Sequence, residues 1–238
     1  MNLIDKYKTD LALNLFKSLS VGYTPEPKYE IPMKYINKKC TLKGSIYPDR
    51  QLLLLQIIKL IGNPINSKQR YIIAMAYAWS KVQYRNETIK FINLYLDNPL
   101  YDGAYKNIKH PFCHSQEEER KYHIYDMQNY LAEAYIGLYD FDNALLTYEK
   151  MIEIFPNIPI AYFGKAETLT KQNRLEDCYN WLITIRKQSP YYKVETRITE
   201  LGQKIKDDWF YNSINKLINE TNEKIMKGYK YKPRKKNG

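Results

Sequence analysis

The sequence lacks the features that define membrane, secreted and disulfide-stabilised proteins. Its most apolar stretch, residues 52–61, is too short to cross a bilayer and contains Gln56 and Lys59. The chain has only three cysteines, scattered at positions 40, 113 and 178, which does not suggest a disulfide framework. The first ten residues are charged and amphipathic, unlike a secretory signal. We therefore expect a cytoplasmic protein with reduced thiols and no membrane span.

The sequence also lacks recognisable catalytic motifs. Its nine glycines are dispersed, so no glycine-rich phosphate-binding loop is present. No serine or cysteine lies in a known nucleophile motif. Neighbouring acids such as Asp140 and Asp142 have the spacing expected at a helix start. We predict that the protein is not an enzyme and needs no cofactor.

Histidine is scarce, and all three histidines lie in one short segment. His110, His114 and His123 are joined there by Cys113, and imidazole and thiolate are good zinc ligands. Their spacing matches no established zinc motif, and the adjacent Cys113 and His114 side chains rarely point in the same direction. We therefore predict a loop over 98–115 without a metal site. A zinc-dependent protein is the third interpretation, after the two given below.

The positive charge is concentrated near the C-terminal end of the sequence. The formal net charge is +11. Residues 221–238 contain seven basic side chains and one acidic side chain, a net charge of +6, which leaves +5 for the other 220 residues. Tyrosine and lysine alternate over 229–232, a pattern that suits base stacking beside phosphate neutralisation. The residues predicted to bind phosphate are Lys227, Lys230, Lys232, Arg234, Lys235 and Lys236. A solvated tail or an anionic membrane surface is the other interpretation.

Two consecutive segments, 125–158 and 159–192, repeat the same residue types 34 positions apart. Such a period is the signature of stacked supersecondary units. Small residues at four of these positions allow two helices to approach closely, and a proline ends each segment's second helix. The equivalent pairs are Ala132 and Ala166, Tyr135 and Leu169, Phe141 and Leu175, Ala144 and Cys178, Tyr148 and Leu182, Met151 and Ile185, and Pro156 and Pro190.

The two segments resemble the tetratricopeptide repeat family. The resemblance rests on Leu131, Ala132, Tyr135, Asp140, Phe141, Ala144, Tyr148 and Pro156. It implies an all-α, right-handed superhelix, or solenoid, of antiparallel helical hairpins. The sequence departs from the family pattern at three positions: Lys165 replaces an apolar residue, and Tyr139 and Asn173 replace the usual glycine between the two helices.

The rest of the chain is predicted to be mainly helical. Helices are expected at 3–18, at 50–61, at 67–83 behind a Ser67 cap, at 86–96 and at 208–226, ending at Gly228. The first has an apolar stripe of Ile4, Tyr7, Leu11 and Leu15. An irregular, extended segment is expected at 21–48, a degenerate repeat at 67–100 and a partial third repeat at 194–206. We predict an N-terminal region 1–110, a repeat region 111–227 with C-terminal capping helices, and a basic tail 228–238.

In a repeat array the first helix of each hairpin lines the concave binding groove. The residues predicted there are Asn129, Glu133, Ile136, Phe163, Glu167, Thr170, Lys171, Thr199, Gln203 and Lys206. Two carboxylates in this set favour a basic, partly apolar peptide or helix over an acidic one. The predicted function is a protein–protein interaction scaffold, whose partner the sequence does not identify. The alternative is a nucleic-acid-associated regulatory protein that uses the basic tail.

Overall fold

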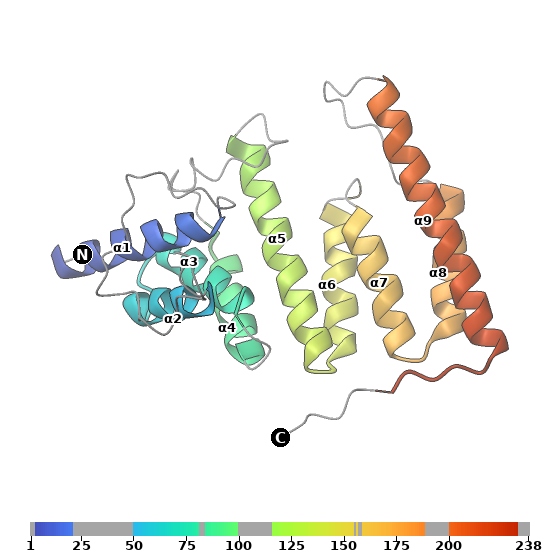
Figure 1. The fold of residues 1–238 in the computed structure, drawn as a ribbon, viewed down its shortest axis with the longest axis horizontal. Helices are drawn as coiled ribbons and strands as arrows, with labels where there is room; N and C mark the ends of the chain where they lie inside the picture. Colours follow the sequence, from blue (N-terminus) through green and yellow to red (C-terminus); the bar gives the residue numbers. More distant parts are fainter. Residues whose placement is uncertain are drawn as a thin grey trace, which may run out of the picture. The chain divides into compact units, whose positions relative to one another are not determined.

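The described part of the chain is helical throughout its regular elements. The computed structural model describes residues 3–20, 50–80, 84–99, 116–154, 156, 159–188 and 200–232 (Figure 1). Within these ranges there is no strand, which confirms the predicted all-α class. The chain divides into an N-terminal unit, Met1–Gly137, and a C-terminal unit, Leu138–Gly238. The predicted extended segment 21–48 lies outside the described residues. So does most of the 98–115 loop, and the boundary after residue 110 stays a prediction.

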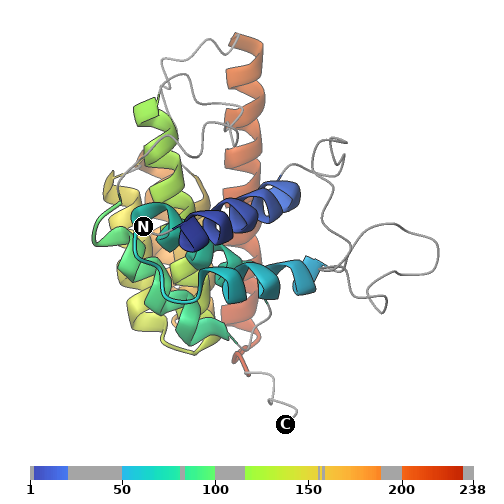
Figure 2. The ribbon, with the colours of Figure 1, turned by 90° about the vertical axis from the view of Figure 1, so that its left-hand side faces the viewer.

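The described part of the N-terminal unit contains five helices, and each packs on the next along the chain. They are α1 (Leu3–Ser20), α2 (Arg50–Ile61), α3 (Ser67–Ala78), α4 (Arg85–Leu96) and α5 (Gln116–Gly137). The first helix also packs on α3, and α3 packs on α5 (Figure 2). The predicted 50–61 helix is confirmed. It ends at Ile61, where the Gly62 N–H donates to the Ile58 carbonyl at 2.9 Å and the positive φ of Gly62, 59°, turns the chain out of the helix.

The cap of α3 lies one residue earlier than predicted. Asn66, not Ser67, is the N-cap, because its Oδ1 accepts from the Gln69 N–H at 2.9 Å. The Gln69 side chain in turn accepts from the Ile65 N–H at 2.8 Å and donates to Thr9 Oγ1 on α1 at 2.7 Å. The helix also stops at Ala78, short of the predicted residue 83. The buried Gln69 amide therefore both caps the start of α3 and joins α3 to α1.

Aromatic side chains fill much of the core of the N-terminal unit. The Tyr71 ring is buried between Phe16 and Tyr95, with centroid distances of 5.8 Å and 5.5 Å. Phe16 also stacks on Trp79 at 5.0 Å. The predicted α1 stripe is wrong at Tyr7, which is 59% exposed. The buried face instead includes Ala12 and Phe16, and the Phe16 ring contacts Tyr71 on α3.

Among its described residues, the C-terminal unit contains four helices. They are α6 (Phe141–Ile154), α7 (Pro159–Lys171), α8 (Leu175–Gln188) and α9 (Glu200–Met226), and the main packing is between helices adjacent in sequence. Asp140 caps α6 as predicted, with its Oδ1 accepting from the Asn143 N–H at 3.3 Å. Cys178 occupies the predicted small-residue position, since its buried thiol donates to the Ala166 carbonyl at 3.3 Å. The thiol therefore serves close packing of α8 on α7.

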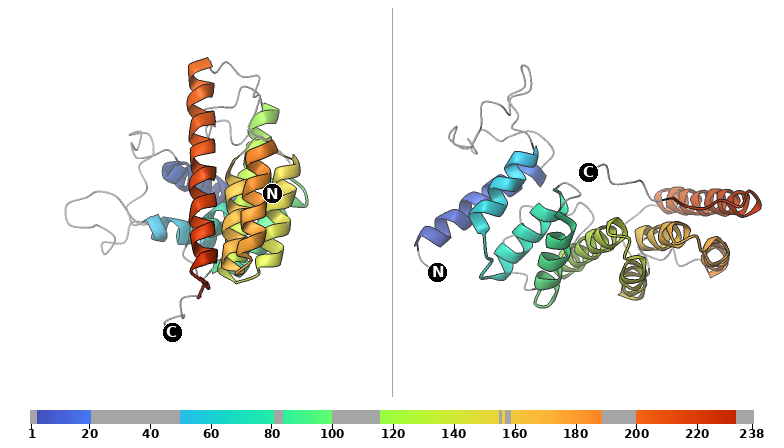
Figure 3. Two further views of the ribbon diagram at one scale, coloured as in Figure 1. Left: turned by 90° about the vertical axis from the view of Figure 1, so that its right-hand side faces the viewer. Right: turned by 90° about the horizontal axis from the view of Figure 1, so that it is seen from below.

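The last helix is longer than predicted. A single helix, α9, runs from Glu200 to Met226, where the sequence suggested a partial repeat to 206 and a separate helix from 208. No proline or glycine interrupts 203–227, so one continuous helix forms. It packs on α8 (Figure 3), and its Phe210 ring contacts Phe163 of α7, as predicted for a covering helix. Its buried stripe contains Phe210, Ile214 and Ile218.

Lys165, the departure from the repeat pattern, lies between two partners. Its ammonium is 2.8 Å from the Glu149 carboxylate and 4.2 Å from the centroid of the Trp181 ring. The Trp181 ring also stacks on Tyr162 at 6.0 Å. A lysine can cover apolar surface with its methylene stem while its charge stays paired. A lysine is therefore tolerated at position 165 because its ammonium pairs with Glu149 and lies over the Trp181 ring.

Two tyrosines are expected to make the protein less stable at alkaline pH. Burial raises the pKa of Tyr162 above 10.0, and burial followed by the nearby Glu87 and Tyr84 raises the pKa of Tyr77. The unfolded chain therefore releases these protons first as the pH rises past 10, so the free energy of unfolding falls there.

We expect the fall between about pH 9 and pH 11 to be smaller in the Y77F/Y162F variant. Urea unfolding at both pH values measures it, with a Y229F variant as the exposed control. An equal fall in wild type and Y77F/Y162F would contradict the assignment.

Candidate functional site

Two residues of the C-terminal unit adopt a left-handed backbone where the repeat family uses glycine. Tyr139 has φ of 64° and Asn173 has φ of 62°. At the α7–α8 turn, the Asn173 N–H donates to the Thr170 carbonyl and the Arg174 N–H to the Leu169 carbonyl, the pair of bonds that closes a helix through a left-handed residue. Asparagine tolerates this conformation, whereas a tyrosine there is an outlier. The strain is therefore concentrated at Tyr139.

The chain after α9 returns to the α7–α8 turn. Gly228, with φ of 61°, ends α9 as predicted, because its N–H and that of Tyr229 donate to the carbonyls of Ile225 and Lys224. Two residues later, the Tyr231 N–H donates to Asn173 Oδ1. The first part of the predicted tail is thus held against the turn, and Asn173 both makes the turn and binds the returning chain.

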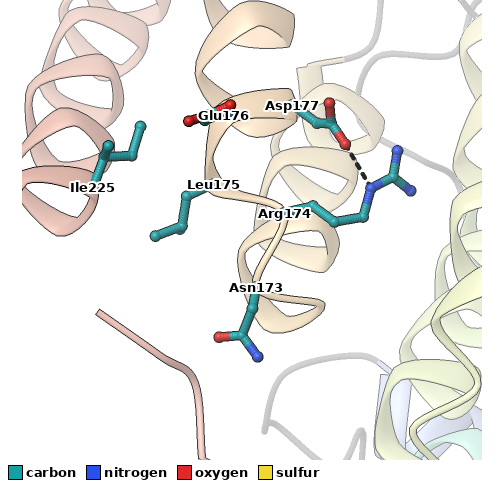
Figure 4. Close-up of a pocket in the computed structure, with 6 residues that line it drawn as sticks. All are labelled: Asn173, Arg174, Leu175, Glu176, Asp177 and Ile225. Atoms are coloured by element: carbon teal, nitrogen blue, oxygen red, sulfur yellow. Dashed lines mark hydrogen bonds and ion pairs between the residues drawn. The ribbon is translucent and has the colours of Figure 1, made fainter. Parts of the chain in front are cut away.

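Two hollows flank Asn173 and Arg174. The first, which we call the turn pocket, has a volume of about 390 Å³ and is lined by Tyr139, Phe141, Lys171, Gln172, Asn173, Arg174 and Tyr231. The second has a volume of about 360 Å³ and is lined by Asn173, Arg174, Leu175, Glu176, Asp177 and Ile225 (Figure 4). Both volumes lie within the range of small-ligand sites. The turn pocket differs from the second in having three aromatic residues in its wall.

The cations of the turn pocket already have acidic partners. Lys171 lies 2.6 Å from Glu167, and Arg174 Nε donates to Asp177 at 2.6 Å. Figure 4 shows the Arg174 side chain directed to Asp177. Gln172 donates to Asp142 at 2.9 Å, which ties the turn to α6. The pocket wall is therefore close to neutral, and it is aromatic and amide-lined rather than an anion site.

The predicted groove residues fall into three groups. On α5, Asn129 donates to Glu133 at 3.0 Å and both carry exposed polar groups, while Ile136 is half-buried. On α7, Glu167 pairs with Lys171, Phe163 packs 5.8 Å from Phe210 on α9, and the Thr170 hydroxyl donates to the Ala166 carbonyl. Thr199 and the side chains of Gln203 and Lys206 lie outside the described residues. Since α5 and α7 belong to different units, a shared groove stays a prediction.

The remaining predicted sites are described only in part. Lys227 pairs with Glu223 at 3.1 Å, whereas Lys230 and Lys232 are exposed and have no ion pair among the described residues. The other tail residues, Arg234, Lys235 and Lys236, lie outside them, as do His110, Cys113 and His114. His123 is buried in the N-terminal unit, where its Nδ1 lies 3.2 Å from the Tyr71 hydroxyl. No metal-binding cluster occurs among the described residues.

Sequence reasoning missed the turn pocket. It singled out Tyr139 and Asn173 as replacements for glycine and noted the alternation of tyrosine and lysine that contains Tyr231. No pattern indicated that these three residues meet, because the contact depends on where the chain turns after Gly228. Phe141 was noted only as the repeat equivalent of Leu175, and nothing in the sequence singled out Arg174.

Comparison with known proteins leaves the chain without an assigned family. The sequence matches no protein-family model and no curated protein. Among the described residues, no helix is long and apolar enough to cross a membrane.

Proposed function

We propose that this chain is a non-enzymatic interaction scaffold that binds a peptide or helix of another protein, with its helices arranged as tetratricopeptide-like hairpins in a solenoid. The packing of the C-terminal unit supports the arrangement, since its main contacts join helices adjacent in sequence. The left-handed residues at Tyr139 and Asn173 also stand where the family has glycine. Both observations concern how the helices are arranged. The kind of partner is inferred from the exposed faces of the helices.

The observation that carries the proposal is the charged face of α7. Glu167 and Lys171 pair with each other across one turn, and the Glu167 side chain is 62% exposed. A pair of this kind contributes about 0.3–0.5 kcal/mol in a helix, so an incoming charge displaces it readily. Phe163 lies one turn earlier and is only half-buried. The face therefore offers a carboxylate beside an aromatic ring.

This chemistry selects a basic, partly apolar partner. A lysine or arginine of the partner can pair with Glu167, and an apolar side chain can pack on the exposed part of Phe163. Glu133 on α5 offers a second exposed carboxylate, which accepts a hydrogen bond from Asn129. An acidic peptide would instead bring like charges together, which costs affinity.

Charge reversal tests the proposal. We expect E133K and E167K each to reduce recovery of the protein's partners from a lysate of the source organism, and the double variant to reduce it at least about tenfold. Nuclease treatment of the lysate should not change the wild-type result. Quantitative mass spectrometry of the captured proteins measures both.

The matched control is E153K, which reverses an exposed carboxylate on α6 outside the predicted groove. It changes the net charge by the same amount as each single variant, so it reports any general effect of added positive charge. Equal recovery with wild type and the double variant would show that these faces do not bind the partner.

A further inference from the structure

We propose that the turn pocket binds an unstacked base of a single-stranded nucleic acid, while Lys230 and Lys232 neutralise the adjacent phosphates. This site shares Lys171 with the charged face of α7 but does not depend on the scaffold function. Its parts come from three segments: the start of α6, the α7–α8 turn and the chain after α9.

The wall of the pocket suits a flat aromatic ring. Tyr139, Phe141 and Tyr231 all line a volume of about 390 Å³, which is large enough for a nucleobase with its sugar. The Tyr139 and Phe141 rings meet edge to face, with centroids 6.1 Å apart, and Tyr139 is 42% exposed. An exposed aromatic ring provides a stacking surface for a base.

The backbone at Tyr139 is a second, independent observation. A bulky residue at φ of 64° is strained, and glycine would remove the strain. Such strained residues cluster at ligand-binding sites, where the side chain is needed. The position keeps a tyrosine whose ring lines the pocket, although its local backbone favours glycine.

The charged side chains in and beside the turn pocket determine which part of a nucleotide enters it. Lys171 and Arg174 are paired with Glu167 and Asp177, so the pocket interior does not favour a phosphate. The lysines that flank Tyr231 in sequence are exposed and have no acidic partner within the described residues. The base therefore enters the aromatic pocket, and the phosphates stay outside with Lys230 and Lys232.

The test compares two fluorescein-labelled 12-nucleotide strands by fluorescence anisotropy, one of deoxythymidine and one of the same length without bases. We expect wild type to bind the base-carrying strand roughly tenfold more tightly. The ratio should approach one in Y139G and in Y231A. Glycine at 139 relieves the backbone, so a loss of binding there is not caused by unfolding, and alanine at 231 keeps the N–H that binds Asn173.

Two controls separate base binding from charge. Y229A removes an exposed tail tyrosine that does not line the pocket, and it should keep the tenfold ratio. K230A/K232A should weaken both strands and reduce the slope of log affinity against log salt by about 1.4. Equal wild-type binding of the two strands, a ratio that survives in both Y139G and Y231A, or no binding of either strand at low salt would each overturn the proposal.

Discussion

Replacing Phe210 with alanine should lower the free energy of unfolding by about 3–5 kcal/mol. The Phe210 side chain is fully buried and joins α9 to the core of the C-terminal unit, with its ring 5.8 Å from that of Phe163 on α7. Truncation loses the transfer free energy of the ring and leaves a cavity that α7 and α9 can close only in part. Denaturant unfolding followed by circular dichroism measures the change.

Two further variants show whether the loss is specific to the buried ring. F210L keeps most of the apolar volume and should cost less than half as much as F210A. N212A changes an exposed residue two positions along the same helix and should alter stability by no more than about 0.5 kcal/mol. A loss below about 1 kcal/mol in F210A would mean that α9 does not pack on this core.

The second large effect is expected at Gly164, within α7. In an exposed helix, glycine to alanine stabilises by about 1 kcal/mol. Here the added methyl group would overlap the buried Tyr148 ring of α6. Overpacking of this kind costs about 1–3 kcal/mol, so we expect G164A to be destabilising. Thermal and denaturant unfolding report the sign directly.

A double variant identifies the cause of this loss. Tyr148 is replaced by leucine at the equivalent position 34 residues later, so Y148L is a conservative way to shorten the side chain. We expect G164A to cost less in a Y148L background than in wild type, because the methyl group then has room. If G164A stabilises the wild-type protein, Tyr148 moves away freely and Gly164 has no packing role.

Helix positions followed closely from local sequence signals. The range 50–61 was predicted correctly because an apolar run ends at Gly62, a residue suited to a left-handed helix end. The end of α9 was predicted for the same reason at Gly228. The start of α3 was misassigned because local signals compete there: Asn66 and Ser67 are both good caps, and only the bond from the Gln69 N–H selects Asn66.

The glycine-like positions show the limit of pattern reading. The repeat pattern identified Tyr139 and Asn173 as unusual residues between helices, and both have a positive φ. The pattern did not indicate which contacts these two residues make in place of glycine. Asn173 uses its side chain to hold the Tyr231 N–H, a contact between residues 58 positions apart.

The sequence alone determined the helical class, the 50–61 and 86–96 helices to within a residue, and the small-residue positions, because these depend on residues close together in the chain. Tertiary structure decided the partners of Lys165, the contact of Phe163 with Phe210, and the assembly of the turn pocket. These features join segments that are distant in sequence, and their geometry depends on how far α9 extends and where the chain turns after Gly228. A local sequence pattern does not show which distant segments meet, because that depends on how the helices pack.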